Sequence, residues 1–154
     1  MRTKSLTLRA IATVDVVTVD RSASLADCAC LMRDRHVGTL VVTDERGRRG
    51  HPVGMLTDRD IVIEAVAPGL DAATLVAGDI MATPLSSVGV DDDVLDALAR
   101  MRETGARRMP VLANDGALVG IVAIDDLLRV MAEQLGQIAS VLGAEMTREA
   151  MTRG

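Results

Sequence analysis

The chain has 154 residues, a formal net charge of −5, 49% hydrophobic residues and 25% charged residues. This balance is typical of a globular protein, and the negative charge argues against a broad nucleic-acid surface. No apolar run reaches the roughly 18 residues of a membrane span, and residues 1–15 lack a signal-peptide pattern, so we predict a cytoplasmic protein without a membrane partner.

Aromatic side chains are absent from the whole sequence, which contains no Phe, Tyr or Trp. A ligand of this protein therefore cannot stack on an aromatic ring, and single-strand-binding platforms of stacked bases are excluded. The core must be packed with aliphatic residues and with the nine methionines, whose flexible side chains fill irregular gaps.

The first half of the chain predicts a strand, a helix, two strands and a second helix. Residues 15–19 form the first short strand, and residues 39–43 and 53–57 form the next two. Ser24 is placed to cap the first helix. The second helix begins near residue 58 and ends at Pro68 and Gly69. Helical spacing of i, i+3, i+4 and i+7 defines the apolar face of the first helix: Leu25, Cys28, Ala29 and Met32.

The second half predicts the same elements in the same order. A strand at 84–88 precedes a helix that Asp93 caps and Gly105 ends. Two strands, 109–113 and 119–123, lead to a last helix from residue 124. The apolar face of the first helix in this half is Val94, Ala97, Leu98 and Met101.

An internal repeat relates the two halves. A shift of 69 residues lays 10–42 on 79–111, and after the longer loop 44–52 the shift becomes 66. We therefore predict a duplicated β-α-β-β-α unit of roughly 60 residues, a size at which two units sharing one chain are expected to form a compact protein.

The cysteines and histidines do not predict a metal or redox site. Cys28 and Cys30 are two residues apart, a spacing that fits neither a redox pair nor a zinc site, and the repeat aligns both with alanines. His36 and His51 lie far apart in the sequence. We therefore expect no metal, and we interpret the cysteines as small helix residues.

Each unit ends in a related motif. The first reads Gly-x-x-Thr-x-x-Asp from Gly54 to Asp60, and the second, from Gly120 to Asp126, has Ala123 in place of the threonine. Thr57 stands where a strand gives way to a helix, whose N-terminus favours a phosphate. Asp60 can accept hydrogen bonds from a ribose diol, as acidic residues do in dinucleotide folds. The alternative is that both are only a helix cap and a first-turn acid.

These paired motifs, together with the segment RRMPV at 107–111, resemble a tandem of cystathionine-β-synthase (CBS) domains. The resemblance covers residues 7 to about 135 and is strongest to small bacterial stand-alone pairs, including the hypoxic-response type. It implies an α/β fold in which two β-α-β-β-α repeats pack as a pseudo-two-fold disc, a Bateman module. The implied domains are residues 7–70 and 71–135, followed by a helical extension, 136–154.

The resemblance also implies two clefts between the repeats that bind adenosine compounds such as AMP, ADP, ATP or NAD. The base would lie between Met55 and Leu85, and two arginines would hold the phosphate, unless they are only solvated surface residues. The second, weaker site has Gly38 and Thr39 in place of the arginines. The implied first site is Met55, Thr57, Asp60, Leu85, Ser86, Arg107 and Arg108, and the second is Val16, Val17, Thr39, Ile121 and Asp126.

The expected function is therefore that of a nucleotide sensor. No Walker-type or Gly-x-Gly-x-x-Gly motif is present, and no nucleophile can be paired with a base, so we do not expect an enzyme. A sensor of this kind signals through a conformational change or through contact with a downstream protein. Two alternatives stay open: a ligand-free interaction scaffold, and a switch based on cysteine oxidation.

The C-terminal segment predicts a further contact. Its apolar residues recur at alternating steps of three and four, which is a heptad-like pattern, although two glycines weaken the helix. We expect a homodimer formed by this segment or by the helices of the disc. The stripe consists of Leu128, Met131, Leu135, Ile138 and Leu142, interrupted by Gly136 and Gly143.

Overall fold

The structure is a computed structural model that describes residues 6–48 and 50–152. Each half of the chain forms one three-stranded sheet, in which the first strand is parallel to the middle strand and the last strand is antiparallel to it. The expected α/β fold of two β-α-β-β-α repeats is confirmed. The strands are β1 (Thr18–Asp20), β2 (Thr39–Thr43) and β3 (Pro52–Thr57) in one sheet, and β4 (Val88–Gly89), β5 (Arg108–Leu112) and β6 (Leu118–Ala123) in the other.

The first strand of each unit begins later than expected. Residues 15–17 precede β1, and residues 84–87 precede β4, without forming a regular ladder. In the first unit the Val41 N–H does donate to the Val17 carbonyl at 3.1 Å, so the chain already runs beside β2 there. These two segments instead line cavities between the units.

The first long helix of each unit forms where its apolar spacing and its cap predict. In α2 (Leu25–Arg35) the Ser24 hydroxyl accepts from the Asp27 N–H, and in α5 (Val94–Thr104) Asp93 accepts from two N–H groups. Gly105 ends α5 with a φ of 69°, a left-handed conformation that favours glycine. These caps satisfy backbone groups that the first and last turns leave unpaired.

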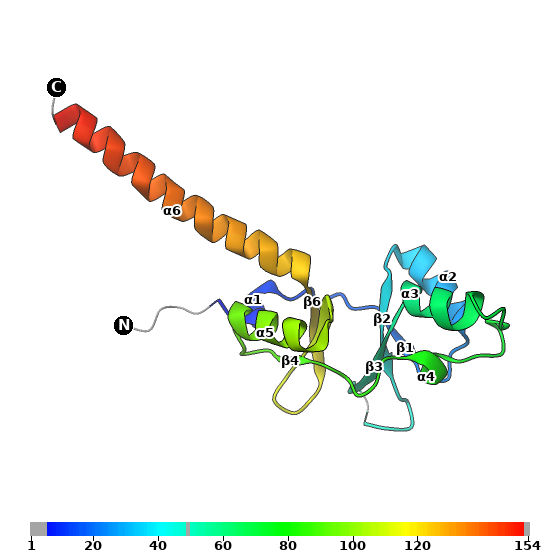
Figure 1. Cartoon of the computed structure of the whole chain (residues 1–154). Coiled ribbons are helices and arrows are strands. Elements are labelled where there is room, and N and C mark those ends of the chain that lie inside the picture. Colours follow the sequence, from blue (N-terminus) through cyan, green and yellow to red (C-terminus); the bar gives the residue numbers. More distant parts are fainter. Residues whose placement is uncertain (1–5, 49, 153–154) are drawn as a thin grey trace.

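The second helix differs between the units. In the first unit α3 (Asp58–Ile61) continues into a π-helical turn, η1 (Val62–Val66), before the chain turns at Gly69. In the second unit the equivalent helix, α6 (Ile124–Thr152), runs for 29 residues. Figure 1 shows α6 extending away from both units. None of the helices in the described part of the chain combines the length and the hydropathy needed to cross a membrane.

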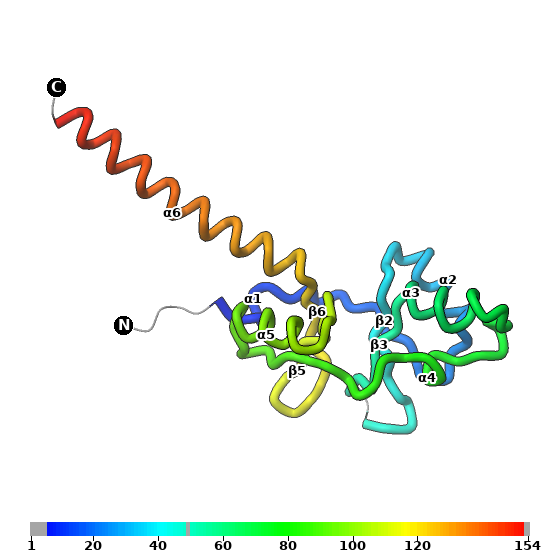
Figure 2. The backbone as a smooth tube through the Cα atoms, viewed as in Figure 1, coloured from blue at the N-terminus to red at the C-terminus, as the bar shows by residue number. Residues whose placement is uncertain are grey.

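Two short helices, α1 (Leu8–Ile11) and α4 (Ala77–Ile80), were not expected, and each packs on the other unit. Leu8 lies in the core of the second unit, whereas Ala77 lies in the core of the first. The tube in Figure 2 shows this path, in which the chain enters beside α5, crosses to the β1 sheet, and later returns past α4. The exchange ties the two units together.

The hydrophobic core is divided between the units. The two buried clusters have no residue in common, and each fills the space between one sheet and its helices. Aliphatic residues, methionines and one cysteine make up the two clusters, which contain no aromatic residue. The first cluster is Leu25, Cys28, Met32, Leu40, Val42, Leu56, Ile61, Ala65 and Ala77, and the second is Leu8, Val88, Val90, Ala97, Met101, Met109, Val111, Val122 and Leu127.

The glycine of each unit-ending motif permits another segment of the chain to approach the strand closely. Gly54 and Gly120 both lie inside strands. A Cβ atom on Gly120 would lie 2.8 Å from the Thr13 carbonyl oxygen, and one on Gly54 would lie 2.6 Å from the Met81 sulfur. The segments that join the two units cross the strands at these points, because isolated bridges link Thr13 with Ile121 and Met55 with Ala82.

Candidate functional site

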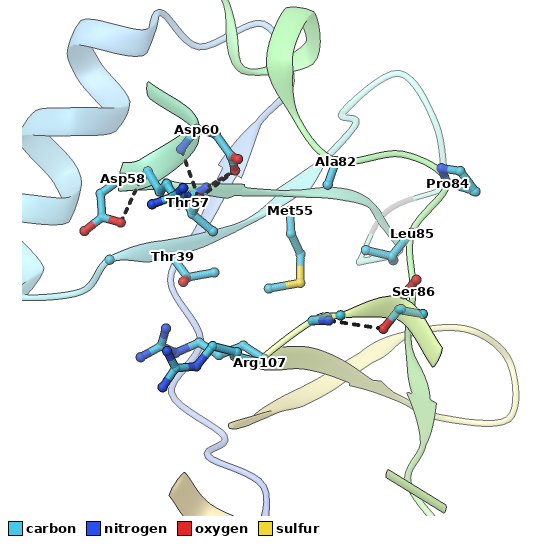
Figure 3. Close-up of a pocket in the computed structure, with 16 residues that line it drawn as sticks. Thr39, Met55, Thr57, Asp58, Asp60, Ala82, Pro84, Leu85, Ser86 and Arg107 are labelled. Atoms are coloured by element: carbon cyan, nitrogen blue, oxygen red, sulfur yellow. Dashed lines mark hydrogen bonds between the residues drawn. The ribbon is translucent and has the colours of Figure 1, made fainter. Parts of the chain in front are cut away.

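A cavity of about 600 Å³ lies between the two units, and residues from both form its walls. This volume is within the range of small-molecule sites. All seven residues of the expected first site line it, together with nine others. Figure 3 shows Met55 and Thr39 projecting into this space from one side and Arg107 lying on the opposite wall. The nine others are Gly38, Thr39, Asp58, Arg59, Ala82, Pro84, Thr104, Gly105 and Ala106.

Thr57 and Asp60 form a capping box at the start of α3. The Thr57 N–H and hydroxyl both donate to Asp60 Oδ2, at 2.8 and 2.7 Å, and the Asp60 N–H donates to the Thr57 hydroxyl at 3.1 Å. The helix-cap interpretation is therefore correct for Oδ2. Within the described residues, Asp60 Oδ1 accepts no hydrogen bond from the protein, so that oxygen is available to a ligand.

Asp126, the counterpart of Asp60, has both carboxylate oxygens engaged. Oδ2 accepts from the Ala123 N–H at 2.9 Å, and Oδ1 accepts from Arg129 Nη2 at 3.1 Å. The alanine at position 123 supplies no hydroxyl to complete a capping box. The two repeats therefore present different carboxylates, one with a free oxygen and one paired with a cation.

The five residues of the expected second site line a smaller cavity of about 270 Å³. The expectation that this cleft lacks both arginines is wrong, because Arg108 lines both cavities. Likewise, Gly38 and Thr39 line the larger cavity as well as the smaller. The units approach closely enough for the start of β2 and the start of β5 to face both spaces, which aligning one repeat on the other could not reveal.

Arg107 and Arg108 carry the positive charge of the larger cavity. Both are exposed, and neither forms an ion pair with a carboxylate in the part of the chain that the structure describes. Arg59 on the opposite wall adds a third cation, and Asp58 and Asp60 add two carboxylates. Unpaired guanidinium groups at a cavity wall are suited to binding phosphate, because they bind it in a bidentate manner.

Thr39 is a feature that the sequence did not indicate as unusual. Its side chain is only 9% exposed, and its hydroxyl is the one buried side-chain polar atom, among the described residues, without a hydrogen-bond partner. The residue lines both cavities. Buried hydroxyl groups are nearly always satisfied, so an unpaired one requires an explanation.

The cysteines occupy different environments. Cys28 is fully buried in the first core cluster, and burial raises the pKa of its thiol, with a further increase from the nearby Asp27 carboxylate. A thiol of this kind is a poor nucleophile near neutral pH. Cys30 is exposed on the opposite side of α2, and the two side chains do not pair.

Comparisons with known proteins identify the architecture. The CBS domain model matches residues 8–66 and 77–133. An uncharacterized protein of Methanopyrus kandleri is 33% identical over 127 residues, which are 82% of this chain and 63% of that protein. The chain therefore spans slightly less than two thirds of this relative.

Two solved structures illustrate the likeness in three dimensions. Hypoxic Response Protein I superposes with a TM-score of 0.71 at 35% identity, covering 80% of this chain and 97% of that one. A hexameric CBS-CP12 protein from bloom-forming cyanobacteria superposes with a TM-score of 0.73 at 32% identity, covering 82% of this chain and 68% of that one.

The first of these structures corrects the expectation of an adenosine ligand without any metal. Hypoxic Response Protein I was crystallised with two coordinated zinc ions, so the inference that a pair of this type carries no metal is wrong. Spacing along one sequence cannot exclude metal ligands that meet only in the folded or assembled protein. In this chain, the described residues contain no group of three or more His, Cys, Asp or Glu side chains placed to hold an ion.

Proposed function

The chain belongs to the CBS domain family, of which it carries a tandem pair, and from this premise we propose that it is a sensor of adenosine nucleotides. Pairs of CBS domains are typically regulatory modules, and the family match agrees with the resemblance seen in the sequence. The proposed ligand is a phosphate-bearing adenosine compound, of the class that includes AMP, ADP, ATP and NAD, in the larger cavity.

One observation carries the proposal, namely the unpaired cations on one wall and the free carboxylate oxygen on the other. Arg107 and Arg108 lack carboxylate partners among the described residues, and Asp60 Oδ1 is open. A nucleotide supplies both complements, because its phosphate accepts from guanidinium groups and its ribose hydroxyls donate to a carboxylate. Met55 and Leu85 offer an apolar clamp for the base.

The signal would arise from the position of the cavity between the units. Its walls come from separate sheets with separate cores, so a ligand that contacts both walls favours the arrangement in which they are closest. A ligand shifts a conformational equilibrium only through such a difference in affinity. We further propose that the sensor is a homodimer that passes this change to a downstream protein; the structural relative from cyanobacteria is a hexamer.

Isothermal titration calorimetry with AMP and with adenosine tests the proposal. Replacing Arg107 and Arg108 by alanine should weaken AMP binding about 100-fold or more, since charged hydrogen bonds contribute about 1.5–3 kcal/mol each. Adenosine binding should change less than threefold. The matched control is Arg102→Ala, an exposed arginine on α5 outside the cavity.

Three results would contradict the proposal: no binding of any adenosine compound by the wild-type protein, equal losses for AMP and adenosine, or equal losses in the control. Each titration is repeated on protein stripped with a chelator and on protein supplied with zinc, so that an effect of bound metal is measured separately. The absence of Trp and Tyr gives a simple preliminary test. An adenine compound that co-purifies should dominate the spectrum near 260 nm.

A further inference from the structure

The stripe of apolar residues on α6 is exposed along its length beyond the second unit. Leu135, Ile138 and Leu142 are 66%, 58% and 57% exposed. Figure 1 shows that no other element of the chain accompanies this part of the helix. Apolar patches of this kind on a protein surface usually mark an interaction site.

The charge pattern of α6 indicates that it is covered by a partner. Glu133 and Glu145 bracket a segment, 134–144, that contains no charged residue through three helical turns. A helix that faces water on all sides normally carries charged residues on its outer face. The lack of charge, combined with the apolar stripe, is typical of a helix that packs against another helix.

Two glycines lie beside the stripe, although no contact within the single chain requires a glycine there. A Cβ atom on Gly136 or on Gly143 would meet nothing within 4 Å. Glycine is a poor helix former, and isolated helices are marginally stable in water. The glycines share a flank of the stripe with Ala132 and Ala139, because all four recur at heptad-related positions. Small residues there allow a second helix backbone to approach closely.

The charges at the end of the helix select both the partner and its direction. Glu145 and Glu149 continue the heptad positions of the stripe. In a parallel pair of identical helices each would face its own copy, which places like charges together. In an antiparallel pair, in which a positions of one helix pack against d positions of the other, Glu145 would instead lie opposite Leu128 of the second copy and next to its Arg129.

We propose that α6 of this chain pairs antiparallel with α6 of a second copy along the stripe Leu128, Met131, Leu135, Ile138 and Leu142. This inference rests on the homodimer put forward above and gives it a surface and an orientation. It does not depend on the nucleotide, because the stripe lies outside the larger cavity. A single antiparallel seam is two-fold symmetric and therefore closes at two copies.

Sedimentation equilibrium of the full chain tests the surface. Ile138→Glu should raise the dimer dissociation constant at least 100-fold, whereas Ser140→Glu, which places the same charge on the opposite face, should change it less than threefold. AMP affinity, measured in parallel, should be the same in both variants, so failure of this surface is distinguishable from failure of the nucleotide site.

A wild-type monomer at tens of micromolar, or a dimer that resists Ile138→Glu, would overturn the inference. So would a monomer that binds anionic lipid vesicles or a heterologous helix through the same stripe. All of these readouts use the whole protein, and circular dichroism confirms that each variant is folded.

Cross-linking tests the direction, in a Cys30→Ser background that leaves only the buried Cys28. An antiparallel pair should form a disulfide between Leu128→Cys and Glu145→Cys when the two variants are mixed, because these a and d positions would face each other across the seam and a disulfide requires Cα atoms about 4.4–6.8 Å apart. Glu145→Cys alone should remain reduced. Efficient oxidation of Glu145→Cys with itself would show a parallel pair and overturn the proposed orientation.

Discussion

Asp60 and Asp126 occupy equivalent positions, and their second oxygens distinguish the two clefts. Each aspartate caps its helix through Oδ2, but Oδ1 of Asp126 binds Arg129, whereas Oδ1 of Asp60 is left open by the described residues. The difference in the motif, a threonine in one copy and an alanine in the other, therefore accompanies a difference in the carboxylate itself. The first repeat therefore has a carboxylate oxygen that is open to a ligand, whereas the carboxylate of the second repeat is paired with Arg129.

This asymmetry predicts unequal effects of matched substitutions. Asp60→Ala should weaken AMP binding at least tenfold, because the ribose loses a charged acceptor worth about 1.5–3 kcal/mol. Asp126→Ala removes a similar helix-cap bond and so controls for stability, and it should change the AMP dissociation constant less than threefold. Calorimetric titration measures both. Similar losses in the two variants would show that the clefts are not specialised.

Thr39 predicts an effect in the opposite direction, on stability. Its buried hydroxyl lacks a partner among the described residues, and an unsatisfied polar group of this kind costs about 1–3 kcal/mol. Thr39→Val, which keeps the shape and suits a strand, should therefore raise the free energy of unfolding of the ligand-free protein by about 1 kcal/mol. Urea denaturation measures it. A clear loss of stability would mean that the hydroxyl is satisfied after all.

At the scale of elements, the sequence predicts what local rules decide. Apolar spacing and the caps Ser24 and Asp93 indicate α2 and α5, since helix ends depend on nearby residues. The exchanged helices α1 and α4 were not predicted, because helices of four residues have little periodicity and are held by contacts with the opposite unit. The family resemblance grouped the seven first-site residues, and all seven line one cavity, although their role in binding stays a prediction.

Two further features of the site depend on tertiary structure. The unpaired hydroxyl of Thr39 and the sharing of Arg108 between cavities arise from residues that meet across the fold, whereas the bond from Arg129 to Asp126 is a local i, i+3 contact within α6. Sequence spacing carries no signal for meetings across the fold. The heptad pattern, in contrast, correctly indicated which face of α6 is apolar, because it is a property of one helix.

The segments that join the two units cross the strands at Gly54 and Gly120. Alanine substitutions at these two glycines should therefore destabilise the fold to different extents. At Gly120 a Cβ atom would press on backbone, the Thr13 carbonyl, whereas at Gly54 its nearest neighbour is the flexible end of Met81. Gly120→Ala should therefore lower the free energy of unfolding by about 1–3 kcal/mol, a typical cost of overpacking, and Gly54→Ala should lower it less. Denaturant midpoints compare them directly. A larger loss of unfolding free energy for Gly54→Ala than for Gly120→Ala would contradict the prediction that the Met81 side chain moves aside more easily than the Thr13 backbone.

For the whole molecule, the division of the core matters more than its size. The two buried clusters have no residue in common. The exchanged short helices connect the two units, and the larger cavity lies between them. This cavity, at the boundary between the units, is where the proposed ligand binds. A nucleotide that contacts both walls would therefore act on stability and on shape through the same contacts.

This arrangement predicts the calorimetric behaviour of the intact protein. Without ligand, unfolding should be broader than a single two-state transition, because each core can melt with partial independence. AMP at 100 times its dissociation constant should stabilise the folded pair by about 2.7 kcal/mol, which for a chain of this length raises the midpoint by roughly 5–10 °C. The transition should also sharpen, since a ligand bound to both walls is lost when either unit unfolds.

With the Arg107 and Arg108 double alanine variant the same AMP concentration should leave both the midpoint and the width of the transition nearly unchanged. A midpoint that rises without sharpening would show that the nucleotide contacts one unit only, and the coupling between ligand and shape would then have to be abandoned even if binding itself were real.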